Sequence, residues 1–201
     1  MEFMDVLRNR RAVRDFKPDA IAPAILRRLA DAAVMAPSAM NDQPWRFTIV
    51  TDGATLERMS TAAKRHLLGC LHVLPKPDHF RDLFSDPHLN LFHRAPALIV
   101  ISADSDNPWA SEDCALAAEN LMLAATELRL GTCWVGFAQA WLNAPEGRAI
   151  LDIPLSHRVV APIVVGVPRA APPSVPRRAP DIKWVGVIAN QPIPDGPHIG
   201  R

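Results

Sequence analysis

Residues 37–47 read Pro-Ser-Ala-Met-Asn-Asp-Gln-Pro-Trp-Arg-Phe, and an apolar segment follows them. The two prolines fix their own φ angles and push the residues before them toward extended backbone. Between the prolines, Ser38, Asn41 and Gln43 offer hydrogen-bond donors and acceptors from a stiffened chain. This pattern suits a planar, polar ligand, but serine and asparagine also favour turns in which they bond to their own backbone. Both interpretations stay open at this point.

A cluster of arginines lies upstream, at Arg10, Arg11 and Arg14. Guanidinium groups bind phosphate through two parallel hydrogen bonds. Basic residues near the end of a helix also complement the helix dipole, so the cluster alone does not require an anionic ligand. A second basic pair, Arg177 and Arg178, lies in a proline-rich segment near the other end of the sequence.

The composition is that of an ordinary globular protein. The 201 residues suffice for one domain with a sizeable core or for two small domains, and 49% of them are hydrophobic. The net charge of +1 creates no strong field for nucleic acid or for an anionic membrane surface. An odd cysteine count without an apolar leader predicts reduced thiols and a cytoplasmic location. No apolar run approaches the roughly 20 residues of a membrane span.

Hydrophobic spacing predicts helices that alternate with a few strands. Helices are expected at 3–7, from Pro23 to before Pro37, from Gly53 to Leu67, at 111–128, and after Asn143, with Asn143 as cap and Pro145 in the first turn. Strands are expected at 47–50, 97–101, 132–135 and 159–167. The segment 111–128 is apolar nearly all round, which predicts burial in the core or at a subunit interface. The alternation indicates an α/β or α+β fold.

Three further segments lack a clear period. Residues 70–93 carry several prolines and histidines, and we expect a lid or a partly helical insert there. Arg81, Phe84, His88 and Phe92 are candidates either for contact with a small-molecule ligand or for ordinary packing within the insert. Residues 168–180 are expected to form an ordered surface strap. The tail 189–201 is expected to cross a neighbour or to fray.

Several motifs together resemble the flavin-dependent nitroreductases. They are Arg-Arg-x-x-Arg-x-Phe from Arg10, Pro-Ser-x-x-Asn-x-Gln-Pro-Trp-x-Phe from Pro37, the helical run Asp113–Ala125, the Gly-Thr-Cys-Trp-Val-Gly run Gly131–Gly136, and the apolar strand Ala161–Pro168. They occur in the family's order across most of residues 1–185. The resemblance implies an α+β fold, a three-layer α/β/α sandwich with a mixed, mostly antiparallel sheet flanked by helices. It further implies that residues 1–201 form a single domain in an intertwined homodimer.

The same resemblance implies FMN sites at the subunit interface, with NADH or NADPH as the electron donor. The residues that it assigns to FMN are Arg10, Arg11, Ala12, Arg14, Pro37, Ser38, Ala39, Asn41, Gln43, Cys133, Trp134, Val135, Gly136, Arg177 and Arg178. The arginines would contact the phosphate and the ring edge, and Arg178 is the preferred candidate of its pair. The loop 37–41 would come from the partner subunit, while Gln43 would either line the pocket or brace the loop. The backbone of 133–136 would run along the ring, where an N–H can bond N5.

Three positions depart from the family pattern. Many relatives have serine where this chain has Ala12, so only the backbone could contact the phosphate there. Some relatives carry glutamate at the position of Val135, a potential contact to the nicotinamide. Glycine is frequent at the position of Arg129, and the sequence offers no account of that change.

Other chemistries have little support in the sequence. It contains no His-Glu-x-x-His, Cys-x-x-Cys, Gly-x-Ser-x-Gly or Gly-x-Gly-x-x-Gly motif, which argues against a metal site, a hydrolase elbow and a dinucleotide fold. Cys133 precedes a tryptophan, as in papain-like proteases, but it lies mid-chain without their lead-in.

We therefore expect an FMN-dependent NAD(P)H oxidoreductase that reduces nitroaromatic, quinone or related acceptors by ping-pong hydride transfer through flavin N5, with no catalytic side chain. The alternatives are a non-catalytic flavin carrier or sensor, and a related enzyme of dehalogenation, azoline oxidation or flavin fragmentation. A cofactor-free protein that binds another anion is a further alternative.

Overall fold

The computed structural model describes residues 1–73 and 75–186. Its centre is a four-stranded sheet of β1 (Trp45–Val50), β2 (Ala97–Ala103), β3 (Gly131–Trp134) and β4 (Arg158–Gly166). The strand order is β1-β2-β4-β3, and every neighbouring pair is antiparallel. The central strands β2 and β4 are buried along nearly their whole length, because helices cover both faces of the sheet.

The segment that follows the first helix pairs with the open edge of β3. Ala12 forms a parallel bridge with Thr132, and the Val13 N–H donates to the Thr132 carbonyl at 2.9 Å. This parallel bridge lies outside the four strands, which are antiparallel throughout. The expected α+β fold is confirmed, with an antiparallel sheet in place of a mixed one.

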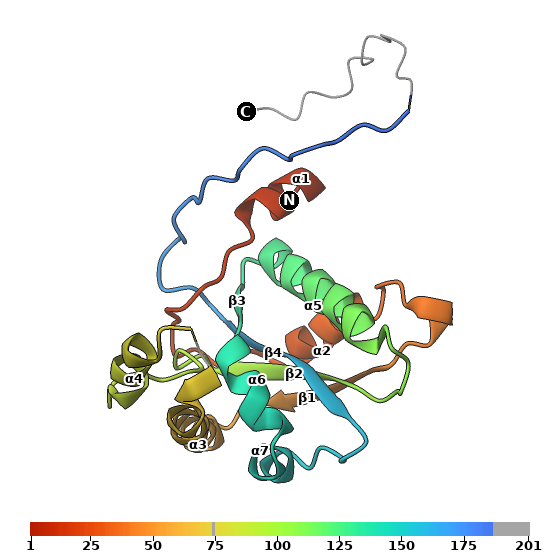
Figure 1. Cartoon of the computed structure of the whole chain (residues 1–201). Helices are drawn as coiled ribbons and strands as arrows, with labels where there is room; N and C mark the ends of the chain where they lie inside the picture. The colour runs from red at the N-terminus through yellow and green to blue at the C-terminus, as the bar shows by residue number, and fades with distance from the viewer. Residues whose placement is uncertain (74, 187–201) are drawn as a thin grey trace.

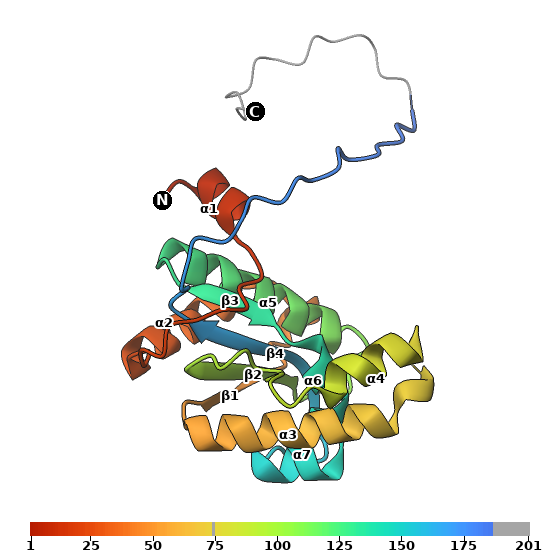
Figure 2. The same ribbon diagram turned by 90° about the vertical axis from the view of Figure 1, so that its left-hand side faces the viewer.

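Helices form one layer on each side of the sheet (Figures 1 and 2). One layer holds α2 (Pro23–Ala33) and α5 (Ala110–Glu127); the other holds α3 (Gly53–Gly69), α4 (Pro77–Ser85), α6 (Gly136–Asn143) and α7 (Pro145–Ile150). Two separate apolar clusters fill the spaces between the sheet and these two layers. Helix α1 (Phe3–Asn9) contacts α5, and η1 (Ala39–Asn41) and η2 (Leu71–Val73) are short 3₁₀ turns. The expected three-layer sandwich is therefore confirmed.

Helix α5 is buried on one face only. Its inward residues, such as Ala117 and Leu121, are fully buried against α2 and the sheet, while Leu116 is 47% exposed. The core of one chain therefore accounts for only part of the apolar surface that the sequence places on this helix.

The connection between β3 and β4 differs from the expectation of one short helix. It contains two, α6 and α7, and Pro145 begins α7 as expected. The prediction that Asn143 caps this helix is wrong, because the N-cap position belongs to Ala144. The Asn143 amide instead bonds β4: its Nδ2 donates to the Val159 carbonyl and its Oδ1 accepts the Val159 N–H, both at 2.9 Å.

The remaining segments follow the sequence in part. Residues 70–93 contain η2 and α4, so they are partly helical as expected, while a role as a lid stays a prediction. Residues 168–180 form no helix or strand; they run over the surface past α1 (Figure 1). The tail 189–201 lies outside the described residues.

Close packing of α6 against α7 depends on the absence of a side chain at Gly147. A Cβ at this position would collide with the Trp141 carbonyl oxygen and would lie 2.7 Å from the Leu142 Cα. We predict that Gly147→Ala lowers the free energy of unfolding by about 1–3 kcal/mol, because the backbones must separate. Gly69→Ala is the matched control, since a Cβ there meets nothing within 4 Å. Equal unfolding midpoints in urea for the two variants would contradict this account.

Candidate functional site

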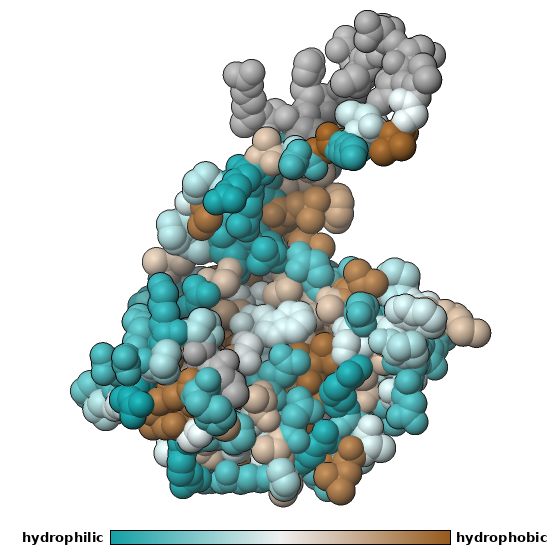
Figure 3. Space-filling model, in the orientation of Figure 1, coloured by the Kyte–Doolittle hydropathy of each residue, from teal (hydrophilic) through white to brown (hydrophobic). Residues whose placement is uncertain are grey.

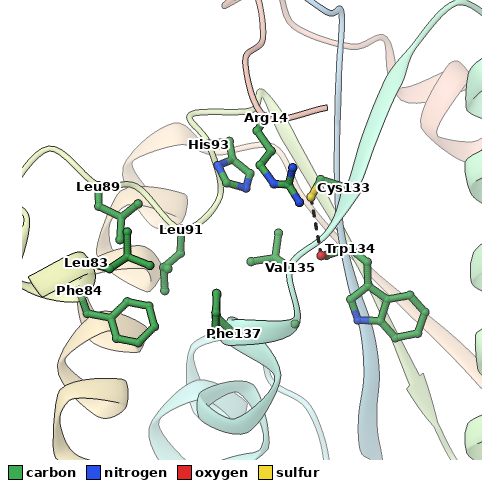
Figure 4. A pocket seen from close by; sticks show the side chains of 11 residues that line it. Arg14, Leu83, Phe84, Leu89, Leu91, His93, Cys133, Trp134, Val135 and Phe137 are labelled. Atoms are coloured by element: carbon green, nitrogen blue, oxygen red, sulfur yellow. Dashed lines mark hydrogen bonds between the residues drawn. The ribbon is translucent and has the colours of Figure 1, made fainter. Parts of the chain in front are cut away.

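The cavity that holds Arg14 and residues 133–136 of the expected site has a volume of about 560 Å³. Four parts of the chain line it: Arg14, which lies between the bridges of Ala12 to Thr132 and of Phe16 to Pro168, α4 with the loop after it, the end of β3, and the start of α6. Figure 4 shows Arg14 and His93 side by side at one end. The apolar wall is formed by Leu83, Phe84, Leu89, Leu91, Val135 and Phe137. The cavity is thus cationic and polar at one end and apolar elsewhere.

Arg14 supplies the positive charge of the polar end. Its guanidinium has no carboxylate partner within 4.0 Å in the described parts of the chain. No aspartate or glutamate lines the cavity. A ligand atom that carries negative charge or oxygen would therefore meet an unneutralised cation here.

Cys133 lies beside Arg14 but is not activated as a nucleophile. Burial raises the pKa of its thiol, and the positive charge and hydrogen bonding of Arg14 offset only part of that rise. The protonated thiol is a poor nucleophile, so the geometry gives the protease alternative no support.

The backbone that follows β3 offers one exposed turn to the cavity. The Val135 N–H donates to the Pro162 carbonyl at 2.8 Å and is therefore occupied. Gly136 is the first residue of α6, where an N–H has no intrahelical acceptor. A Cβ at Gly136 would meet nothing within 4 Å, so the backbone there faces open space. The Trp134 indole points away from the cavity (Figure 4).

His93 is a lining residue that the sequence did not single out. It has φ of +55°, its neighbour Arg94 has φ of +50°, and both lie in the left-handed region. Buried Asn90 holds this turn, because its Oδ1 accepts the N–H of Phe92 at 2.9 Å and of Arg94 at 3.3 Å. The bonds from Asn90 to this turn are local, so Asn90 is the residue in the sequence that could have indicated it. Asn90 is itself held by its Nδ2, which donates to Glu57 of α3 at 2.7 Å.

The arginines of the first motif point to different places. Arg10 Nε forms an ion pair with Glu119 of α5 at 3.3 Å. The Arg11 Nη1 donates to the Arg8 and Arg10 carbonyls at 2.5 and 2.8 Å, and its Nε is buried without an acceptor. Arg11 and Arg177 line a groove of about 750 Å³ that does not include Arg14. The structure thus brings Arg177, and not the preferred Arg178, near Arg11.

The loop 37–43 lies far from the cavity, because it leads into β1 at the opposite edge of the sheet from β3 (Figure 1). Three of its residues have positive φ, namely Met40, Asn41 and Gln43. The strained backbone is held by bonds from the Gln43 N–H to Ser38 Oγ and from Gln43 Nε2 to Asn41 Oδ1, both at 3.0 Å. Gln43 therefore braces the loop.

The loop is also tied to α5. The Ala39 N–H donates to Oδ1 of Asp113 at 3.0 Å, and Asp113 is buried. Pro37 is exposed, and the Ser38 hydroxyl is engaged within the loop. One chain therefore presents the loop and the cavity as two separate, ordered surfaces.

Within residues 1–73 and 75–186, no group of three histidine, cysteine or acidic side chains is arranged to hold a metal ion. No helix in the same residues is long and apolar enough to cross a membrane.

Comparison with known proteins agrees with this geometry. The chain matches the Nitroreductase family over residues 7–167 and belongs to that family, and is therefore an oxidoreductase by family. A putative NADH dehydrogenase/NAD(P)H nitroreductase of Archaeoglobus fulgidus is 29% identical, over 84% of this chain and 86% of the relative. A 5,6-dimethylbenzimidazole synthase of Rhodospirillum rubrum is 28% identical, over 92% of this chain and 88% of the relative. The crystal structure of a nitroreductase with bound FMN from Bacteroides fragilis has a TM-score of 0.80 and 28% identity, over 92% of this chain and 100% of that one.

The environment of the cysteines predicts their reactivity. Burial raises the pKa of Cys114 to about 12 and also raises that of Cys133. A raised pKa leaves less thiolate at a pH of about 8, so both should resist iodoacetamide in the folded protein. Half-buried Cys70 should be alkylated first, as mass spectrometry of the digested protein can show. Faster labelling of Cys133 than of Cys70 would contradict this description of the cavity.

Proposed function

We propose that this chain is an FMN-dependent NAD(P)H oxidoreductase that reduces nitroaromatic, quinone or related acceptors in a ping-pong cycle. The observation that carries the proposal is the polarity of the cavity at the end of β3, with Arg14 and His93 at one end and apolar walls elsewhere. A flavin ring has the same division, because one edge carries oxygen and nitrogen atoms and the other carries methyl groups. The nitroreductases and the FMN-bound structure that resemble this chain support the choice of cofactor.

The residues of the cavity fit the ring in three ways. Arg14 offers an unneutralised guanidinium to the oxygen-bearing edge, where it would stabilise negative charge. Gly136 offers a backbone N–H at a point without a side chain, suited to N5. The apolar wall excludes water from the ring face. FMN supplies the hydride chemistry when bound, so no catalytic side chain is required.

The phosphate would bind among the remaining arginines. Arg11 has a buried Nε without an acceptor and shares a groove with Arg177, which makes Arg177 the better candidate of its pair. Arg10 would contribute from its position against Glu119. Ala12 offers no hydroxyl, and its backbone lies on the bridge to β3.

We further propose that the site is completed by a second copy of the chain. The loop 37–43 lies at the opposite edge of the sheet from the cavity, so it can contribute only to the cavity of another subunit. Exposed apolar side chains support such an interface: Met40 is 93% exposed and Phe3 of α1 is 66% exposed. Apolar surface gathers beside α1 (Figure 3). Burial of such side chains favours association.

A second candidate function is a reaction on the flavin itself. Its support is the relative named 5,6-dimethylbenzimidazole synthase, which is about as similar to this chain as the named nitroreductase. A flavin carrier without turnover is a third, since Val135 supplies no polar contact to a nicotinamide.

The direct test is the cofactor content and turnover of the purified protein. We expect FMN in an equimolar amount with the chain, and oxidation of NADH or NADPH in the presence of a quinone such as menadione. Parallel lines in double-reciprocal plots would indicate the ping-pong cycle. Bound FMN without oxidation of either donor would favour the carrier, and conversion of the flavin under oxygen would favour the synthase-like reaction. A chain that rejects added FMN would contradict all three.

A further inference from the structure

We propose that His93 is the second side chain, beside Arg14, that hydrogen-bonds the oxygen-bearing edge of the flavin ring. The inference rests on the proposed function and deepens it, since neither the sequence motifs nor the comparisons assign a role to this residue. Figure 4 shows the His93 imidazole and the Arg14 guanidinium side by side at the same end of the cavity. The two side chains come from segments almost 80 residues apart, 93 and 14, so the fold brings them together.

The backbone that carries His93 is strained and braced. His93 and Arg94 both have positive φ, a conformation that is unfavourable for residues with a Cβ. Asn90 compensates by accepting two N–H groups, and its own Nδ2 donates to Glu57 of α3 at 2.7 Å. The Leu91 N–H donates to the buried hydroxyl of Ser60, also on α3, at 2.9 Å. The turn is therefore anchored to α3 by Asn90 and Leu91, and these contacts hold His93 at the cavity.

The charges around His93 favour its neutral form. The charged or titratable groups that share the cavity with it are Arg14 and, on β3, the thiol of Cys133. The side chains that face the cavity from α4 and α6 are apolar, and no carboxylate is among the lining residues. Burial lowers the pKa of His93 below its usual 6.5, and the positive charge of Arg14 lowers it further. At neutral pH the imidazole is therefore uncharged.

A neutral imidazole has one donor and one acceptor, which suits the flavin edge because that edge alternates carbonyl oxygens with an N–H. Arg14 can only donate, so His93 supplies the acceptor that Arg14 lacks. When the pH falls below the lowered pKa, His93 gains a proton, loses its acceptor and adds a second positive charge. That charge favours the anionic reduced ring over the neutral oxidised ring.

The test compares flavin binding by the apo-protein of three variants, measured by quenching of flavin fluorescence. His93→Gly removes the imidazole without a backbone penalty, because glycine accepts positive φ. We expect this variant to bind FMN and riboflavin about tenfold more weakly, by the same factor for both, since the two ligands carry the same ring and one hydrogen bond to it is lost. His93→Gln, which retains a donor and an acceptor, should recover most of the affinity, and free imidazole should restore binding to the glycine variant. His72→Ala, an exposed histidine on η2 that does not line the cavity, should match the wild type.

A second readout is the pH dependence of the reduction potential of the bound flavin. On acidification below pH 6.5, the usual pKa of an imidazole, the potential of the wild type should rise more steeply than that of His93→Gln, because the imidazole gains a charge there and glutamine does not. Three results would overturn the proposal: equal pH slopes of the potential in the two proteins, unchanged flavin affinity of His93→Gly, or a loss of affinity for FMN but not for riboflavin.

If the wild type binds FMN and any of these three results is found, the proposed function stands and only the role of His93 is refuted. If the wild type binds neither flavin, the proposed function fails and this inference fails with it.

Discussion

The site depends on the contact of residues 12–16 with the edge of the sheet. Gly131 of β3 and Gly166 of β4 are paired in register, and the N-terminal segment lies directly over both. A Cβ on Gly131 would lie 2.8 Å from the Val13 side chain, and one on Gly166 would lie 2.7 Å from the Phe16 ring. These two glycines allow the segment to approach closely enough to pair with Thr132. Because side chains alternate along an extended chain, this pairing directs Arg14 into the cavity that His93 also lines, and Arg11 into the groove that Arg177 also lines.

The same sheet explains why one chain holds only part of the proposed site. Its two edges, β1 and β3, carry the loop 37–43 and the cavity, and the buried strands β2 and β4 separate them. Each surface is ordered by bonds within its own half: Asp113 holds the loop and Asn90 holds the wall of the cavity. Preformed halves of this kind lose little entropy when two copies associate. In the proposed dimer, the exposed side of α5 and the apolar side chains of α1 would have a role that they lack in the isolated chain.

Much of the fold could be predicted from the sequence, because the strands and long helices follow simple periods. Apolar runs gave β2 and β4, and the helical spacing of apolar residues gave α2, α3 and α5. The prediction that Asn143 caps α7 was wrong, because its side chain forms tertiary hydrogen bonds with Val159 of β4 in place of a local capping bond. His93 was missed for a related reason: its left-handed turn is held by Asn90, and Asn90 is in turn held by a tertiary bond to Glu57 of α3. Arg11 and Arg14 line different cavities because side chains alternate along an extended chain, but this could be predicted only once the pairing of the segment with β3 is known.

The central claim is that the cavity of one chain is completed by the loop of another, and complementation between two inactive variants tests it most directly. Arg14→Ala removes the cation of the cavity, and Asn41→Ala alters the loop. Each variant alone should bind FMN weakly. Co-expressed and purified through two different tags, the mixed dimer should recover one site of wild-type affinity, because one cavity then combines an intact Arg14 with an intact Asn41. A mixed dimer that binds FMN no better than either parent would show that each site is built within a single chain.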